Sequence, residues 1–476
     1  MPTLLSTDGY KFSMAEAGWP LRAETFYYSH RRGGAQYLPL DVEAYVRSHL
    51  PVVKPADYAW LAATDYEMGG GFKAAILQTD KLRISALPRG CWFFDREPVF
   101  SMSGPSALVS WFEPLLLMLN YRIQVATLAL RDATALAQAV ATVTCDAQAE
   151  IVRETCDAVE VKAPPIRVDS DGYFKAVRAQ VADLVKIVGD PARVFEVGLR
   201  AATCLEQHEI ALRACKDAGV VRTSNVEGAR KLGMIAVGTM GHEHVQRYGS
   251  DRAAFRAMRD RRPNRSSFLL DTFDTITSGM PAAFEIIAEE PHAGHSVRYD
   301  SGDKVTQYLA VVERGRALGA EPVHILEDGF DAELTRKFEQ LRELVGVQPM
   351  RQFYGYGGYI VARSMPGGLT RDKVSAVYKL SQTGGRPCMK FGNETGLGKQ
   401  SLPGKPVVFR RTSASGPISI IGQEGERPPQ GYTQLTGGRN HQGAIATAVA
   451  LGEAAEVTTS AATNELIRQL SANSNG

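Results

Sequence analysis

The stretch Ser296-Val297-Arg298-Tyr299-Asp300-Ser301-Gly302-Asp303 joins a short apolar run to a cluster of charged and small residues. Such a run, bounded by a turn, is typical of a buried β-strand. The cluster then lies at the carboxyl end of the strand. An arginine there can clamp a phosphate or carboxylate with two hydrogen bonds, and an aspartate can hold hydroxyls or a metal ion. The alternative is an internal salt bridge that caps the next helix.

Six further runs of the same kind occur between residues 190 and 360, and each is closed by polar residues. They are Arg193–Leu199, Gly219–Val221, Met234–Val237, Ser267–Leu270, Pro322–Leu326 and Gln352–Tyr354. Most are separated by a stretch long enough for one helix. Strand, polar tip and helix repeated in this way predict a parallel β/α barrel. In such barrels catalytic groups gather at the carboxyl ends of the strands, so we expect an enzyme that handles a phosphorylated, anionic substrate.

A histidine follows the third strand tip. Gly238-Thr239 leaves backbone N–H groups free to meet an anion, and His242 has the chemistry of a nucleophile or an acid/base. The spacings His242-x-His244 and His292-x-x-His295 also raise metal binding, but no third ligand lies nearby in sequence. A purely structural histidine is the alternative.

Two other tips carry glycine. Gly357 and Gly358 permit close approach of the backbone to a phosphate, although any strand-to-helix turn uses such residues. Glu327 and Asp328 precede Gly329 and fit either a sugar clamp or a helix cap. Near the amino end, the segment 30–34, His-Arg-Arg-Gly-Gly, adds a basic patch or a solvated loop.

Composition narrows the functional classes. The chain has 476 residues, of which 44% are hydrophobic and 22% charged, so it can bury a large core and is long enough for two domains. A net charge of +2 argues against nucleic acid or acidic membranes as partners. The six cysteines show no Cys-x-x-Cys spacing. No apolar run reaches transmembrane length, and the first residues do not form a basic region followed by an apolar core. We therefore expect a cytoplasmic protein.

The regions that flank the barrel pattern are rich in strand-like runs. These are Thr25–Ser29, Phe72–Gln78, Cys91–Phe94, Pro98–Met102, Val374–Leu380, Pro387–Phe391 and Pro406–Arg411, whereas Leu108–Leu119 and Leu128–Ala158 look helical. We therefore expect one α/β flanking domain from residues 1–125 and 366–450, a β/α barrel over 126–365, and a C-terminal tail over 451–476 that frays from Ser471.

The chain resembles the nicotinate phosphoribosyltransferase family in a series of ordered motifs. They are residues 7–11 (Thr-Asp-Gly-Tyr-Lys), 196–200 (Glu-Val-Gly-Leu-Arg), 223–225 (Thr-Ser-Asn), 238–243 (Gly-Thr-Met-Gly-His-Glu), 298–303, 377–380 (Val-Tyr-Lys-Leu) and 402–410. They extend from residue 7 to about residue 411, and the Asp-Ser-Gly-Asp, Gly-Thr-x-x-His and Tyr-Lys-Leu segments are jointly specific.

The resemblance implies a fold and a reaction. The fold is an α/β architecture of the type II phosphoribosyltransferase kind: an irregular seven-stranded β/α barrel plus an α/β domain built from both chain ends. The reaction joins nicotinate to phosphoribosyl pyrophosphate and gives nicotinate mononucleotide and pyrophosphate in NAD salvage. The resemblance further implies ATP as co-substrate, coupled through a phosphohistidine, Mg²⁺ as cofactor, and a homodimer with shared active sites. No metal ligand is assigned.

The resemblance also assigns roles. His242 matches the residue that becomes phosphorylated. Arg298 and Asp300 match positions that contact the pyridine ring, the ribose and the phosphates. We expect Asp300 to stabilise the cationic ribose. The other positions it matches are Tyr10, which the partner subunit lays over the ring, the phosphate-facing Arg32 and Arg200, the sugar position Glu327 and Asp328, and the phosphate loop Gly357 and Gly358. Arg31 lies one register away from Arg32.

Three positions bear on the substrate. Val197 stands where many members carry an aromatic residue that stacks on the pyridine, and Phe195 should face the other way on the strand. Ser224 replaces the aspartate of the nicotinamide-specific branch, which favours nicotinate because an aspartate would repel a carboxylate. Arg371, in contrast, resembles an arginine of the nicotinamide-specific branch that reaches a phosphate.

Rival functions remain open. A nicotinamide phosphoribosyltransferase keeps the fold and the chemistry. A different phosphate-handling barrel, such as an aldolase or isomerase, explains the barrel but not the terminal motifs, and no strand tip carries a Schiff-base lysine except Lys304. A non-catalytic nucleotide-binding relative is a third reading, against which intact His242, Arg298 and Asp300 count.

Overall fold

The structure, a computed structural model, describes residues 1–391, 400–413, 416–437 and 456–473. Its largest sheet has seven strands in the order β10-β9-β8-β14-β13-β12-β11, and every pair is parallel. The strands are β8 (Val194–Glu196), β9 (Arg222–Thr223), β10 (Ile235–Ala236), β11 (Ser267–Leu269), β12 (Ser296–Tyr299), β13 (Val323–Leu326) and β14 (Gln352–Tyr356). Six of the seven expected runs contain a strand, whereas Gly219–Val221 does not: the strand β9 forms in the two residues directly after it, Arg222 and Thr223. Among the described residues, β10 and β11 are the unpaired edges, so the barrel is open on one side.

Helices follow the barrel strands, and three of them begin at residues with capping side chains. Asn225, Asp303 and Asp331 each accept a backbone N–H at the start of the next helix, which satisfies donors that the helix cannot. These helices are α11 (Val226–Leu232), α15 (Lys304–Leu318) and α16 (Ala332–Leu344), and the others around the sheet are α9 (Ser170–Val188), α10 (Leu205–Asp217), α12 (His242–Tyr248), α13 (Asp251–Arg261), α14 (Met280–Glu289) and α17 (Gly358–Val361). The capping alternative is therefore correct for Asp303.

A second sheet is built from both ends of the chain. Its five strands run in the order β16-β15-β1-β5-β3, all antiparallel, and β1 lies between strands from the two ends. The strands are β1 (Ala23–His30), β3 (Arg83–Ala86), β5 (Pro98–Pro105), β15 (Ala376–Thr383) and β16 (Arg386–Pro387). The predicted fold class, a seven-stranded β/α barrel with an α/β domain from both ends, is confirmed.

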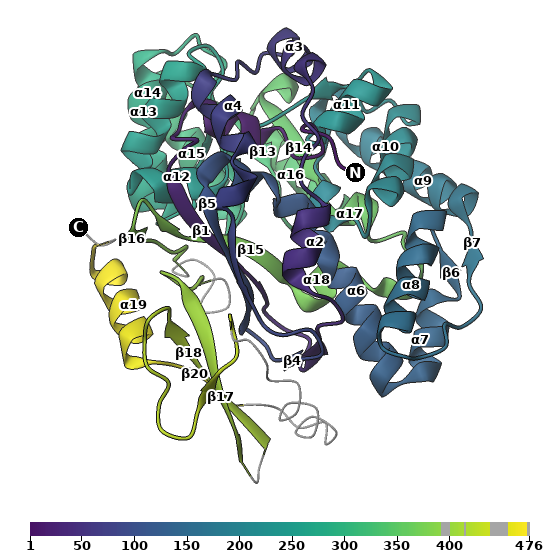
Figure 1. Ribbon diagram of the computed structural model, residues 1–476. Helices are drawn as coiled ribbons and strands as arrows, with labels where there is room; N and C mark the ends of the chain where they lie inside the picture. The colour runs from purple at the N-terminus through teal and green to yellow at the C-terminus, as the bar shows by residue number, and fades with distance from the viewer. Residues whose placement is uncertain (392–399, 414–415, 438–455, 474–476) are drawn as a thin grey trace.

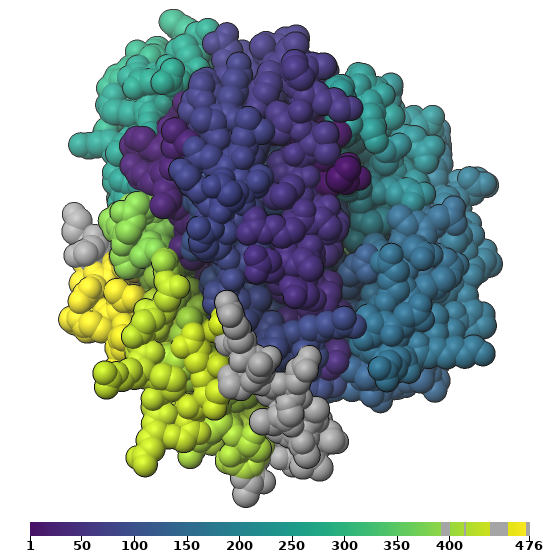
Figure 2. All heavy atoms as spheres, in the orientation of Figure 1, coloured from purple at the N-terminus to yellow at the C-terminus, as the bar shows by residue number. Residues whose placement is uncertain are grey.

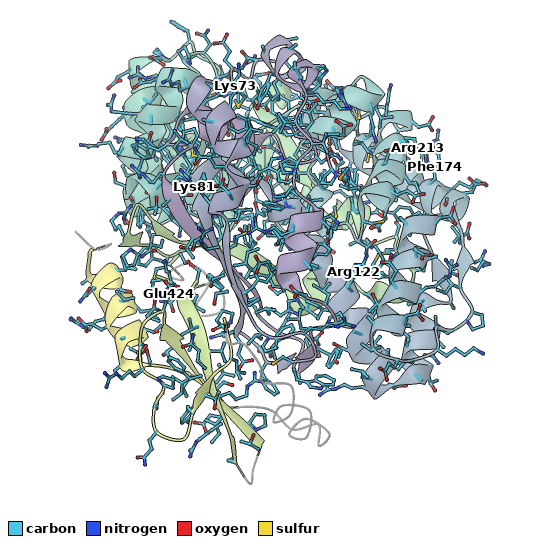
Figure 3. All side chains as sticks on the ribbon, viewed as in Figure 1. Lys73, Lys81, Arg122, Phe174, Arg213 and Glu424 are labelled. Atoms are coloured by element: carbon cyan, nitrogen blue, oxygen red, sulfur yellow. The ribbon has the colours of Figure 1, made fainter. Side chains whose placement is uncertain are left out.

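Helices from the amino-terminal half cover this sheet and connect it to the barrel. They are α1 (Tyr10–Glu16), α2 (Val42–Ser48), α3 (Pro55–Ala63), α4 (Gly70–Leu77), α5 (Ser106–Trp111), α6 (Glu113–Arg131), α7 (Ala133–Val140) and α8 (Asp146–Ala158), with α18 (Arg371–Val374) from the later half. Figure 1 shows α6, α7 and α8 grouped beside the paired strands β6 (Thr142–Val143) and β7 (Arg167–Val168). Arg122 of α6, labelled in Figure 3, pairs with Glu154 of α8 at 2.8 Å.

The C-terminal part forms a small unit of its own. Strands β17 (Pro406–Ser413), β18 (Gly416–Gln423), β19 (Thr433–Gln434) and β20 (Glu456–Thr459) make a four-stranded sheet, followed by α19 (Ala461–Asn473). Figure 2 shows this unit, coloured yellow-green and yellow, projecting from the body of the molecule, whereas the purple N-terminal segments lie between two groups of teal helices. The short strands β2 (Gln36–Tyr37) and β4 (Trp92–Phe93) pair separately. No helix in the described ranges is both long and apolar enough to cross a membrane.

Several expected elements differ from the structure. The run Phe72–Gln78 is not a strand: it lies in α4, because Phe72, Ala75 and Ile76 recur at helical spacing and are buried together. The helix expected over Leu128–Ala158 is interrupted after α6, where Asp132 caps α7, and again at β6. The run Pro387–Phe391 contributes only its first residue to β16.

The tail also differs from expectation in part. Residues 456–459 pair with β18 and residues 461–473 form α19, so the helix continues past Ser471. Residues 438–450 of the expected flanking domain, and 451–455 and 474–476 of the expected tail, lie outside the described residues. The domain boundaries themselves remain predictions.

The amino-terminal segment is tied to the tips of the barrel strands. The Gly9 N–H donates to the Ser224 carbonyl at 2.8 Å, and the Val226 N–H donates to the Thr7 carbonyl at 3.2 Å. A Cβ atom at Gly238 would lie 2.4 Å from the Gly9 carbonyl carbon, so only glycine fits between the two backbones. The segment therefore reaches the barrel through close backbone contact.

We expect Gly238→Ala to destabilise the protein by about 1–3 kcal/mol, because the added methyl group overpacks a contact between two backbones. Gly71→Ala is the matched control: that glycine lies in α4 with no atom within 4 Å of its Cβ position, and the change should stabilise by about 0.5–1 kcal/mol. Urea unfolding of both variants tests this. Equal midpoints would show that the contact is not close in solution.

Candidate active site

A cavity of about 610 Å³ lies between the carboxyl ends of the barrel strands and one face of the five-stranded sheet. This volume is within the range of sites that hold small molecules. The expected site residues that line it are Tyr10, Val197, Arg200, His242, Arg298, Asp300, Glu327, Asp328, Gly357, Gly358 and Arg371. Residues scattered over most of the chain length thus meet at one place, as convergent strand ends require.

Arg298 lies at the centre of this cavity, held from several sides. Its guanidinium donates to the Met240 carbonyl at 2.7 Å and to Asp300 at 3.2 Å, and its Nε lies 3.1 Å from Glu327. Burial opposes its charge, but these two carboxylates raise the pKa of Arg298. Burial also raises the pKa of Glu327. The result is a cation of fixed orientation flanked by two acids.

His242, the first residue of α12, faces an acid and a lysine. Its Nε2 lies 2.9 Å from Asp271 Oδ1 and 2.8 Å from Lys390 Nζ, and Lys390 also lies 2.9 Å from Asp271 Oδ2. Burial and the nearby Lys390 lower the pKa of His242, so the ring is neutral at neutral pH. Although burial opposes it, His242 and Lys390 hold the pKa of Asp271 well below its usual range.

Sequence reasoning missed Lys390 as a site residue and gave Asp271 no role. Asp271 was visible as the polar residue that closes the fourth apolar run. Lys390 comes from the segment after β16, more than a hundred residues from His242, and no local pattern marks it. Only the fold brings it to the barrel.

His242, Asp271 and Asp300 form a cluster of groups that can ligate cations. One ligand atom from each lies within 4.8 Å of the others. Magnesium prefers six oxygen ligands, whereas this cluster contains a ring nitrogen and already holds the Lys390 ammonium against all three of its members. The residues as they lie do not fit a resident magnesium ion.

Tyr10 completes the opposite wall of the cavity. The Arg200 guanidinium lies 5.0 Å from the centre of its ring, and the phenol hydroxyl donates to Glu113. Lys11 balances that acid at 2.7 Å. Tyr10 was expected from a partner subunit, but in this structure it lies over the cavity of its own chain, because the segment before it is bonded to the barrel tips.

Two residues expected to contact ligand do not line the cavity. The Ser224 hydroxyl donates to Asp8 Oδ1 at 2.6 Å, because the amino-terminal segment covers it. Arg32 donates to the Asp372 carbonyl at 3.2 Å, whereas its neighbour Arg31 is in the cavity lining. Both arginines lie directly after β1, which ends at His30.

Val197 lines the cavity, and Phe195 does not: its ring stacks on Phe353 with centres 5.4 Å apart. The loop at Gly357 and Gly358 lines the cavity as expected. A Cβ at Gly355 would lie 2.5 Å from Glu327 Cγ, so glycine there makes room for that acid.

Comparison with known proteins shows the fold first. Solved nicotinate phosphoribosyltransferases from Porphyromonas gingivalis and Vibrio cholerae match with TM-scores of 0.57 and 0.58 at 17% and 16% identity. The matches cover 82% of this chain in both cases, and 94% and 87% of the solved chains. This chain therefore has the fold of those solved structures.

Sequence relatives carry the same name. A nicotinate phosphoribosyltransferase of Mycobacterium tuberculosis is 28% identical over 243 residues, 50% of this chain and 49% of the relative, so the chain spans about half the length of that relative. The human nicotinate phosphoribosyltransferase is 25% identical over 90% of this chain and 81% of the relative. No family model matches. The resemblance to nicotinate phosphoribosyltransferases expected from the motifs is confirmed.

Lys379 of β15 lines the cavity and is a group there that can change charge near neutral pH. Burial lowers the pKa of Lys379 to about 7, and the nearby cations Arg31, Lys390 and Arg371 add to the shift. The side chain is cationic below pH 7 and neutral above it.

We expect pyrophosphate to bind more tightly at pH 6 than at pH 8, and Lys379→Arg to reduce this difference, because arginine stays charged. Calorimetric titration of both proteins at both pH values measures it. The same pH dependence in the two proteins would contradict the role of Lys379.

Proposed function

We propose that this protein is a nicotinate phosphoribosyltransferase that acts in NAD salvage. The observation that carries the proposal is the position of Arg298 between Asp300 and Glu327, facing His242, in a cavity at the barrel mouth. The fold shared with solved nicotinate phosphoribosyltransferases and the sequence similarity over 90% of the chain support it.

The transfer step needs charge stabilisation more than a base. The pyridine nitrogen lone pair forms a bond to the anomeric carbon of phosphoribosyl pyrophosphate, and the bond from that carbon to the pyrophosphate oxygen breaks. No proton is removed from the nitrogen. Asp300 faces the positive charge that develops on the ribose, and Arg200 and Arg298 face the departing anion.

ATP coupling through His242 is part of the proposal. A ring nitrogen of neutral His242 attacks the γ-phosphorus of ATP, and the bond to the ADP oxygen breaks. The ring then gives up its proton, for which Asp271, 2.9 Å from Nε2, is the acceptor within reach. Magnesium is the cofactor expected from the resemblance. A homodimer and a cytoplasmic location likewise remain expectations.

Nicotinamide phosphoribosyltransferase is the second candidate, and two observations favour it. Arg371, which resembles the nicotinamide branch, lines the cavity. Ser224, which was expected to accept the nicotinate carboxylate, is bonded to the buried acid Asp8. The assignment of nicotinate therefore rests on the similarity to proteins of that name.

A product assay with phosphoribosyl pyrophosphate, magnesium and either base, with and without ATP, tests the function. We expect nicotinate mononucleotide as the main product, formed faster with ATP. Arg298→Gln should lower kcat/KM by about 10²–10³, because a buried charged donor is lost. The control is Arg256→Gln, which removes an exposed arginine paired with Glu289.

The two candidates give different outcomes in this assay. Nicotinamide mononucleotide as the main product would replace the first candidate with the second. Product from neither base would reject both, and binding of a nucleotide without turnover would indicate a non-catalytic relative. ATP stimulation that persists in His242→Ala would remove the phosphohistidine step alone.

The source of Tyr10 is tested by mixing variants. We expect that Tyr10→Ala and Arg298→Ala, refolded or expressed together, recover no activity beyond their separate values, because both residues line the cavity of one chain. If each cavity took Tyr10 from a partner, mixed dimers would contain one intact site, and activity would rise. Light scattering of the mixture reports whether dimers are present.

A further inference from the structure

The carboxylate of Glu196 is enclosed at the carboxyl end of β8. The residue is fully buried, and its carboxylate accepts three hydrogen bonds from three different elements. The donors are the Gly198 N–H at 2.6 Å, the His208 Nε2 at 3.0 Å and the Thr223 hydroxyl at 2.6 Å. Glu196 thus joins its own loop to α10 and to the end of β9.

The protonation of His208 follows from its second partner. Asn225 accepts the Gly228 N–H through Oδ1 at 2.9 Å, which leaves its Nδ2 to donate to His208 Nδ1 at 2.9 Å. Since Nδ1 accepts, the proton of the neutral ring is on Nε2, where it is given to Glu196. Burial opposes ionisation of Glu196, but its contacts with His208 and Thr223 lower its pKa. Every polar atom of this chain of contacts has a defined partner.

The first consequence concerns the loop that carries Val197 and Arg200. Gly198 is held by Glu196 through its N–H, and its carbonyl accepts the Ala201 N–H at 2.8 Å, which closes the 3₁₀ turn Leu199–Ala201. A Cβ at Gly198 would lie 2.8 Å from Glu196 Oε1 and 2.3 Å from Val361 Cγ2. The turn that presents Arg200 therefore packs directly on the carboxylate.

The second consequence concerns the amino-terminal segment. The Thr223 hydroxyl that donates to the Glu196 carboxylate also accepts the Asn225 N–H at 3.0 Å, and the next residue, Val226, donates its N–H to the Thr7 carbonyl at 3.2 Å. Between them, the Ser224 carbonyl accepts the Gly9 N–H at 2.8 Å. Asp8, bonded to the Ser224 hydroxyl, lies 3.1 Å from Arg200 Nε. Both routes from Glu196 thus end at the pair that forms one wall of the cavity, Tyr10 and Arg200.

We propose that Glu196, with His208, is a positioning pair that sets Arg200 and Tyr10 together. Neither residue lines the cavity, so the pair acts through the groups it holds. Its catalytic consequence rests on the proposed function, whereas its effect on the two segments does not. Loss of the Glu196 charge should loosen residues 197–201 and 7–11 at the same time, although they are far apart in sequence.

The test compares Glu196→Gln with Glu339→Gln. Glu339 is also a buried acid, held by Arg193 and by the Tyr354 hydroxyl at 2.7 Å. It lies near the amino ends of the strands, because its partner Arg193 directly precedes β8 and its partner Gln352 begins β14. Both variants remove one buried charge. They differ in which end of the barrel sheet they disturb.

Hydrogen exchange measured by mass spectrometry is the first readout. We expect faster exchange in both segments, 7–11 and 197–201, in Glu196→Gln, and wild-type exchange there in Glu339→Gln. His208→Gln, whose amide N–H can replace the Nε2–H, should change exchange less than His208→Ala. Unchanged exchange in Glu196→Gln, or equal changes in both glutamate variants, would overturn the proposal.

Steady-state kinetics is the second readout. We expect kcat/KM for phosphoribosyl pyrophosphate to fall about 10–100-fold in Glu196→Gln, because small displacements of positioning groups are costly, with little change in Glu339→Gln. Wild-type kinetics in Glu196→Gln despite faster exchange would overturn the positioning role. Altered exchange in a protein whose wild type forms neither mononucleotide would reject the proposed function and keep the structural coupling.

Discussion

Charge balance in a buried space is the constraint on which the rest of this site depends. Removing one partner of a buried ion pair costs about 3–5 kcal/mol, because the other charge is left without water or counter-charge. Arg298, Lys390 and Lys11 are all buried, and each contacts two carboxylates. The acids come from different elements of the fold. The arrangement therefore requires that the barrel, the amino-terminal segment and the segment after β16 be placed together.

The same constraint gives the cavity its chemical character. Arg200, Arg298 and Lys390 line the cavity and are each held by an acid, so their orientation is set before an anion binds. Arg298 is the clearest case, with Asp300 and Glu327 on either side. His242 is kept neutral by burial and by Lys390, which preserves a lone pair for chemistry. Such preorganised charge makes the largest contribution to transition-state stabilisation in many enzymes.

The sequence predicted most of the barrel and much of the cavity lining. Short apolar runs closed by polar residues are a local signal, so six of the seven strands were located and the seventh, β9, lies directly after its expected run; His242, Arg298 and Asp300 were recognised at the strand tips. The failures have physical reasons. Phe72–Gln78 is ambiguous because a short apolar run fits a strand or a buried helix, and tertiary packing decided for α4. Arg31 and Arg32 both lie directly after β1, and sequence alone does not settle which of the two reaches the cavity.

Contacts between distant segments were beyond reach from the sequence. Ser224 was interpreted as a ligand because nothing in its surroundings shows that Asp8, more than two hundred residues earlier, lies against it. Lys390 and Glu113 were missed for the same reason. The sequence by itself determined the approximate position of each barrel strand and the polar residues around its carboxyl end, since these depend on local periodicity and turn chemistry. Only the tertiary structure decided which of them share the cavity, because hydrogen bonds and ion pairs there join segments that chain order keeps apart.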